Sequence, residues 1–111
     1  MPHCIIEHSS SIDSKALMQV VFRGVLESAL FEPNGNDIKL RSQAYSNYQV
    51  GIATTDFIHV VLKILSGRSA ANKKKLSHLV LDHFTSLKFK NCSITVEVVD
   101  IERSSYAKAV L

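Results

Sequence analysis

The sequence predicts an α+β fold in which two β-α-β units share one sheet, and three observations support this. Residues 2–9 alternate loosely and residues 57–65 form a short, mostly apolar run, and both patterns are expected of strands. Each run is followed by a segment with helical spacing and then by a second extended run, at 38–48 and at 94–99. Each unit is long enough for a crossover helix, so we expect right-handed parallel pairing within it and a two-layer sandwich of one sheet backed by two helices.

The third observation is a weak internal repeat. A shift of 56 residues lays residues 2–6 on 58–62, and a shift of 59 lays the apolar positions of the first helix on those of the second. We interpret this as a duplicated β-α-β unit within one domain of residues 1–111, with approximate repeats 2–48 and 57–100. Chance similarity between two such units is the alternative.

The first unit begins at Pro2, where proline costs no ladder hydrogen bond because it is the first residue of the strand. The loop Ser9–Ser11 and Asp13 offer helix N-caps. The helix that follows has two apolar stripes, which predicts that it is covered on more than one side. The stripes are Leu17, Val20, Val21, Gly24 and Ser28, and Met18, Phe22, Val25 and Ala29. Residues 31–36 end the helix, because they contain a proline and an Asn-Gly pair.

The second unit begins after residues 47–55, which we expect to form a turn or hairpin. The strand 57–65 is apolar on both faces, so it should lie centrally in the sheet. Ser66 or Ser69 should cap the next helix. Its apolar stripe consists of Leu76, Leu79, Val80, Phe84 and Leu87. Residues 102–111 form a polar tail.

The composition limits the classes of partner. With 13 Lys and Arg against 10 Asp and Glu, the net charge of +3 suits a small anionic molecule better than nucleic acid. The basic run Lys73–Lys75 is typical of a solvated helix face. Cys4 and Cys92 lack metal-site spacing and are expected to be buried free thiols. No apolar run reaches the roughly 18 residues of a membrane span, so we expect a cytoplasmic protein with no membrane partner.

The start of the chain, Met1-Pro2-His3, contains a candidate catalytic group. If Met1 is removed, Pro2 becomes a free secondary amine, and an α-amino group ordinarily has a pKa of about 7.7 to 8.0. Such an amine can accept a proton near neutral pH. Proline at position 2 is common, so the dipeptide alone is weak evidence.

The combination of features is more specific. A chain that begins Met1-Pro2, comprises two β-α-β units and carries the sequence LKILSGRS over residues 62–69 resembles the tautomerase superfamily. Within it, the likeness is closest to the 5-carboxymethyl-2-hydroxymuconate isomerases. The segments that carry this likeness are residues 2–7, 38–48 with Arg41, 57–69, and His83-Phe84.

This resemblance implies a tautomerase-type homotrimer that needs no cofactor. It implies that Pro2 is the general base and that Arg68, and less securely Arg41, bind substrate carboxylates. The implied substrate is a small anionic unsaturated carboxylate, 5-carboxymethyl-2-hydroxymuconate, in 4-hydroxyphenylacetate degradation. Physical reasoning agrees, because arginines disfavour a protonated amine and grip carboxylates with paired hydrogen bonds.

Other assignments stay open. Without the family resemblance, Arg41 and Arg68 would be interpreted as ordinary exposed charges. The enzyme could act on a phenylpyruvate-like enol or a haloacrylate, or the chain could be a non-catalytic ferredoxin-like module that binds anionic partners. His3 and His59 are expected to be packed or interface residues. His78 and His83 do not share a helix face, which argues against a metal pair. Nothing in the sequence selects among Tyr45, Tyr48 and Tyr106 as a hydrogen-bond donor to substrate.

Overall fold

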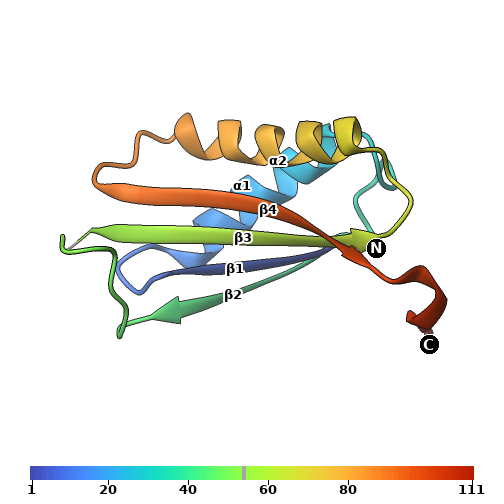
Figure 1. The fold of residues 1–111 in the computed structure, drawn as a ribbon, viewed down its shortest axis with the longest axis horizontal. Helices are drawn as coiled ribbons and strands as arrows, with labels where there is room; N and C mark the ends of the chain where they lie inside the picture. Colours follow the sequence, from blue (N-terminus) through green and yellow to red (C-terminus); the bar gives the residue numbers. More distant parts are fainter. Residues whose placement is uncertain (54) are drawn as a thin grey trace.

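The computed structural model describes residues 1–53 and 55–111 and has one four-stranded sheet with both helices on one face (Figure 1). In chain order the elements are β1 (His3–Ser9), α1 (Ser14–Glu27), β2 (Lys39–Tyr45), β3 (Asp56–Leu65), α2 (Ala70–Thr85), β4 (Cys92–Ile101) and the 3₁₀ turn η1 (Arg103–Ser105). The predicted α+β sandwich, a sheet backed by two helices, is confirmed.

The sheet has the strand order β2-β1-β3-β4. Each β-α-β unit pairs its own two strands in parallel, and the units join through the antiparallel pair β1 and β3. Ile5 pairs directly with Val61, which is 56 residues further along the chain. The strand 57–65 was predicted to be central, and β3 does lie between β1 and β4.

The core lies between the sheet and the helices. Alternate residues of β1 and β3 face it, and Cys4, Ile6, Val60 and Leu62 are fully buried. The helices meet closely at Gly24, where a Cβ would lie 2.9 Å from the Cα of Val80. A side chain there would push α1 and α2 apart, so the first helix needs glycine at this position.

The helix caps follow the sequence. The Asp13 side chain caps α1 by accepting from the Lys15 N–H, and Ser69, rather than Ser66, caps α2 through the Asn72 N–H. Several expectations about ends need correction. Three residues lie beyond the helices in which their stripes placed them, namely Ser28, Ala29 and Leu87. Ile38 and residues 46–48 lie outside β2, and β4 is longer than 94–99 at both ends. The predicted connection 47–55 includes residue 54, which lies outside the described residues, but Val50 and Ala53 form a β-bridge within it.

Two expectations about burial hold only in part. Met18 and Phe22, on the second stripe of α1, pack at the edge of the core rather than inside it. Both cysteines are free, but only Cys4 is buried, whereas Cys92 is partly exposed. Among the described residues, no helix has both the length and the apolar character that a membrane span requires.

Candidate active site

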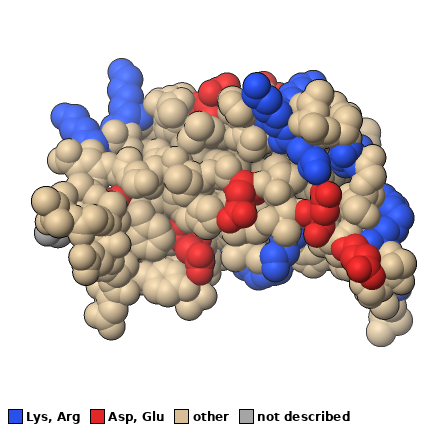
Figure 2. All heavy atoms as spheres, in the orientation of Figure 1, with Lys and Arg blue, Asp and Glu red and all other residues tan. Residues whose placement is uncertain are grey.

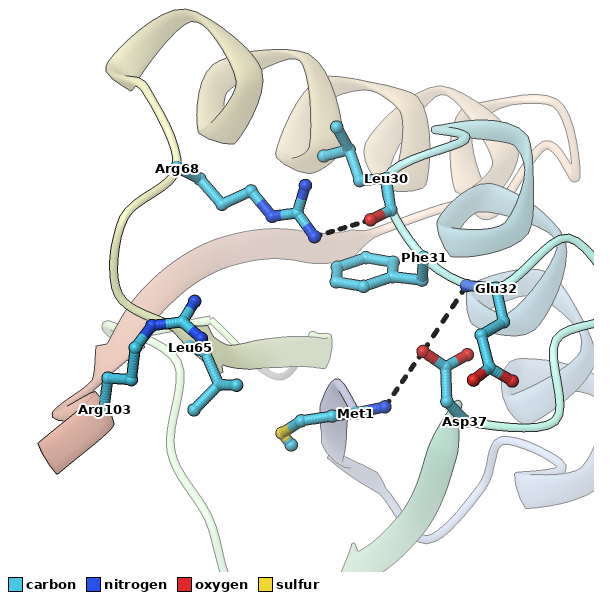
Figure 3. Close-up of a pocket in the computed structure, with 8 residues that line it drawn as sticks. All are labelled: Met1, Leu30, Phe31, Glu32, Asp37, Leu65, Arg68 and Arg103. Atoms are coloured by element: carbon cyan, nitrogen blue, oxygen red, sulfur yellow. Dashed lines mark hydrogen bonds and ion pairs between the residues drawn. The ribbon is translucent and has the colours of Figure 1, made fainter. Parts of the chain in front are cut away.

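The chain's amino terminus lies in a sheltered position between the sheet and the α1–β2 loop. Pro2 is buried, and its carbonyl accepts a hydrogen bond from the Lys39 N–H over 3.0 Å. The Met1 ammonium group lies 3.0 Å from Oδ2 of Asp37, which also accepts a hydrogen bond from the backbone N–H of Glu32 (Figure 3). The loop between α1 and β2 therefore brings a carboxylate to the start of the chain.

A cavity of about 440 Å³ opens at this point. Its lining comes from the amino terminus, the α1–β2 loop, the end of β3, the β3–α2 turn and η1. The residues are Met1, Leu30, Phe31, Glu32, Asp37, Leu65, Arg68 and Arg103. Figure 3 shows Arg68 and Arg103 on one side and Asp37 and Glu32 on the other, with Phe31 between them. The cavity thus has a cationic wall and an acidic wall.

Arg68 reaches the cavity from the turn between β3 and α2. The turn contains Gly67 with φ of +119°, a backbone conformation that favours glycine. Nη2 of Arg68 donates to the Leu30 carbonyl over 2.6 Å, and its guanidinium carbon lies 5.2 Å from the centre of the Phe31 ring. These contacts orient the guanidinium, which has no carboxylate partner among the described residues. It can therefore receive an anion.

Arg103 is the second cation of the cavity. Its Nε and Nη2 both donate to the Ser66 carbonyl, over 3.2 and 3.0 Å, so η1 is tied to the same turn that carries Arg68. We did not predict Arg103 to be a site residue, because it lies in the tail after the last strand. Because Arg103 belongs to no periodic pattern or motif, the sequence does not indicate where its side chain lies in the fold.

Arg41 lies elsewhere within this chain. It stands on β2 and does not line the cavity, and its Nη1 is 3.3 Å from Nδ1 of His3. Alternation along β1 and β2 places both residues on the sheet face away from the helices. The structure thus places Arg68 beside the chain start, but it does not bring Arg41 and Arg68 into one cavity.

His3 sits between Arg41 and the tail. Its Nε2 is 3.0 Å from the hydroxyl of Tyr106, so Tyr106 contacts the residue that follows Pro2. Burial, followed by the positive charges of Arg41 and Lys39, lowers the pKa of His3 below its ordinary value of 6.5. This shift favours the neutral form of the imidazole beside Pro2.

The remaining polar residues form local pairs. His59 contacts Thr95 and Glu97 over 2.6 Å each, and His83 contacts Glu27 over 2.6 Å. Lys73 pairs with Asp100 over 3.2 Å. On the face shown in Figure 2, acidic residues lie close to the basic ones, so no large patch of one sign forms there. In the part of the chain that the structure describes, no three His, Cys, Asp or Glu residues form a metal-binding group.

Comparisons with known proteins agree with this architecture. The model of the 5-carboxymethyl-2-hydroxymuconate isomerase family matches residues 2–109. A search of curated proteins found no match.

Solved structures of several tautomerase-superfamily members share the fold. A 5-carboxymethyl-2-hydroxymuconate delta-isomerase is 17% identical with a TM-score of 0.71, and the alignment covers 99% of this chain and 89% of that one. The isomerase from Deinococcus radiodurans R1 is 18% identical, with 97% and 88% covered and a TM-score of 0.71. A fused 4-OT asymmetric trimer is 15% identical, with 96% and 91% covered and a TM-score of 0.80. The family model confirms the resemblance to the 5-carboxymethyl-2-hydroxymuconate isomerases, and the solved structures show that the fold is shared.

Proposed function

This chain belongs to the 5-carboxymethyl-2-hydroxymuconate isomerase family, and we propose that it moves a proton within 5-carboxymethyl-2-hydroxymuconate by using the Pro2 amine as general base. The reaction transposes a C=C bond, needs no cofactor and yields the 2-oxo-3-ene product, as a step of 4-hydroxyphenylacetate degradation.

The observation that carries the proposal is the position of the chain start in a cavity with two guanidinium groups. Met1 lines the cavity, so its removal would leave the Pro2 nitrogen beside the space that Met1 occupies. Pro2 is buried, and burial disfavours the charged form of an amine. The positive charges of Arg68 and Arg103 act in the same direction. A neutral amine that can accept a proton is what this reaction needs.

The chemistry follows from the cavity's polarity. Arg68 and Arg103 bind carboxylates of the substrate, and the amine faces its 2-hydroxyl group. The Pro2 lone pair takes the hydroxyl proton, so an N–H bond forms as the O–H bond breaks, and negative charge spreads over the dienolate toward the arginines. The same proton is then returned to the distal carbon. The enzyme is unchanged at the end of the cycle.

We also propose a homotrimer in which a neighbouring subunit supplies Arg41 to this site. The sheet face away from the helices is partly apolar, with Ile5, Val61 and Val99 half-buried in the single chain. Fused 4-OT relatives of the same fold are trimers. In sedimentation experiments we expect three chains per particle, and Val61→Asp should dissociate them. A fully active monomer would contradict this assembly.

The decisive experiment compares three proteins whose intact masses have been measured. The parent chain without Met1 should isomerise the substrate, as followed by ultraviolet absorbance. Pro2→Ala should lower kcat/KM at least 100-fold, in the range typical of general acid–base catalysis. A chain extended by Gly-Ser before Pro2, in which the proline nitrogen is an amide, should be equally impaired.

The outcomes separate the alternatives. Unchanged activity in Pro2→Ala and in the extended chain would overturn the role of Pro2. Activity only on a phenylpyruvate-like enol or a haloacrylate would keep the base and replace the substrate.

A further inference from the structure

We propose that Asp37 is a positioning residue for the general base, in that its carboxylate binds the Pro2 amine after Met1 is removed and stabilises the ammonium form during the proton shift. This inference rests on the Pro2 amine of the proposed function. It adds the residue that would orient that amine and set the strength of the base.

The first argument is that Asp37 already binds the chain's amino group. Its Oδ2 lies 3.0 Å from the Met1 nitrogen, and the two side chains are only 14% and 10% exposed. The Lys39 N–H to Pro2 carbonyl bond fixes the start of β2 against Pro2, two residues from Asp37. Removal of Met1 moves the free amine by one peptide unit, which leaves it beside the same loop.

The second argument is an unused acceptor. Oδ1 of Asp37 is buried and has no hydrogen-bond partner among the described residues. Buried polar atoms normally have partners, so this oxygen marks a place for a donor that the chain with Met1 does not supply. A prolinium ion carries two N–H groups, and the Asp37 carboxylate offers two oxygens. The Pro2 ammonium group therefore suits this carboxylate.

The third argument concerns charge. Burial raises the pKa of Asp37, but hydrogen bonds from the terminal amine and from the Glu32 N–H outweigh it and hold this pKa below its ordinary value. Asp37 is thus a carboxylate at neutral pH. Other charged or titratable groups face the amine from the α1–β2 loop, the β3–α2 turn, η1 and the sheet. Glu32, Arg68 and Arg103 line the same cavity, His3 and Cys4 interact electrostatically with the terminal amine, and Lys39, Arg41 and Lys63 act on His3.

These groups shift the pKa of the Pro2 amine in opposite directions. Arg68 and Arg103 favour the neutral amine that accepts a proton, whereas Asp37 favours the ammonium ion that results. A neutral Pro2 has one N–H group and one lone pair. If the N–H donates to Asp37, the lone pair is directed away from the carboxylate. Asp37 would therefore orient the lone pair of the Pro2 amine and raise the pKa of that amine.

The test measures the pKa of the Pro2 amine without requiring turnover. The probe is 2-oxo-3-pentynoate, which inactivates the structural relative Pt0534. Conjugate addition forms a bond between the neutral amine nitrogen and the alkyne, and the amine proton ends on carbon, so the chain gains the mass of one reagent molecule. Labelling rates of the chain without Met1 would be measured from pH 5 to 9 by intact mass, with peptide mapping to Pro2.

Asp37→Asn should lower the pKa of the amine, because it removes the negative charge that stabilises the ammonium ion. At pH 6 we expect labelling about tenfold faster than in the parent chain, since one pKa unit is a factor of ten in neutral amine. Glu32→Gln is the matched control: it removes the same charge from the same cavity but from a side chain without a contact to the amine. It should change the rate less than twofold. Asp37→Glu, which keeps the charge, should stay closer to the parent than Asp37→Asn does.

Identical pH profiles for the parent, Asp37→Asn and Asp37→Glu would overturn the inference. An equal shift in Glu32→Gln would also overturn it, because the effect would then be one of general charge. Retention of Met1 in the isolated protein would overturn both this inference and the proposed function. A shift specific to Asp37 in a protein that fails to isomerise the muconate would support Asp37 and refute the proposed substrate.

Discussion

The two ends of the β1–β3 pair occupy equivalent places in the fold but differ in chemistry. At one end, the Met1 ammonium group meets Asp37 beside Arg68. A shift of 56 residues carries Met1 to Phe57, whose ring packs against Tyr45 and Tyr48 at centroid distances of 6.2 and 5.1 Å. An aromatic cluster therefore occupies the place that corresponds to the amino terminus.

The polar contacts at the second end are also different. Asp56 accepts hydrogen bonds from the hydroxyls of Ser11, over 2.9 Å, and Tyr48, over 3.4 Å. The Phe57 N–H donates to Oγ of Ser9 over 2.8 Å. Hydroxyl groups here take the place of the guanidinium and ammonium groups at the first end. The free amine that we propose belongs to the first end, since Phe57 lies within the chain.

Pro2 and its counterpart Ile58 should differ most when they are substituted. Ile58 is only 1% exposed, so Ile58→Ala should lower the free energy of unfolding by about 2 to 5 kcal/mol through lost packing. Pro2→Ala should affect activity far more than stability. Urea denaturation at fixed protein concentration measures both variants. A larger loss of stability in Pro2→Ala than in Ile58→Ala would contradict this difference in role.

The second effect concerns the two strand-to-helix turns. Arg68→Ala should lower kcat/KM about 10- to 100-fold, because a charge-assisted hydrogen bond to a substrate carboxylate is lost. Arg68→Lys should fall between the parent and Arg68→Ala, since lysine keeps the charge but not the planar donor pair. Ser11→Ala, in the first turn, is the control and should leave kcat/KM unchanged. Equal losses in Arg68→Ala and Ser11→Ala would show that the two turns have not diverged in function.

A smaller effect concerns the carboxylates. The pKa of Asp37 is lower in the folded chain than its usual value of about 3.9 in an unfolded chain. Its contribution to stability is therefore present above that value and is lost as the pH falls through the folded pKa. Asp37→Asn should lower the free energy of unfolding by about 1 kcal/mol at pH 7 and by less at pH 3. Thermal melts between pH 3 and 7 measure this difference in stability. The same pH dependence in Asp56→Asn would show that the carboxylates at the two ends contribute alike.

The smallest effect concerns the two thiols. Burial raises the pKa of Cys4 to about 12, and burial together with Asp56 raises that of Cys92. Because Cys92 is the more exposed thiol, iodoacetamide at pH 8 should label it at least about tenfold faster than Cys4. Peptide mapping distinguishes the two sites. Faster labelling of Cys4 would mean that β1 opens more readily than the start of β4.

Much of the fold was predictable because its signals are local. Extended patterns at 2–9, 38–48, 57–65 and 94–99 identified all four strands, and the central position of β3 followed from apolar residues on both of its faces. Asp13 and Ser69 act as caps because a short polar side chain can reach the free N–H groups of the first helical turn. The ends of elements were less predictable. Leu87 continues an apolar stripe, yet it lies beyond α2 and is half exposed, because helix ends depend on tertiary packing as well as on periodicity.

The site was predictable where a motif carried it and unpredictable where a long-range contact built it. Arg68 follows the glycine of a recognisable turn, and the structure places it beside the chain start. Arg103 and Asp37 lack such a motif, since one lies in the tail and the other in a loop. They join the cavity because η1 binds the β3–α2 turn and the α1–β2 loop binds the amino group. No local pattern records either contact.

Local sequence thus establishes the strand and helix types, the family resemblance and the possible chemistry of the Met1-Pro2 start. These features depend only on residues that are close together in the chain. Three features required the folded chain: Asp37 faces the amino terminus, Arg103 rather than Arg41 joins Arg68 within one chain, and Phe57 fills the equivalent place at the other end. Each of these contacts joins segments that are far apart in the chain, and such segments meet only through the packing of the whole sheet.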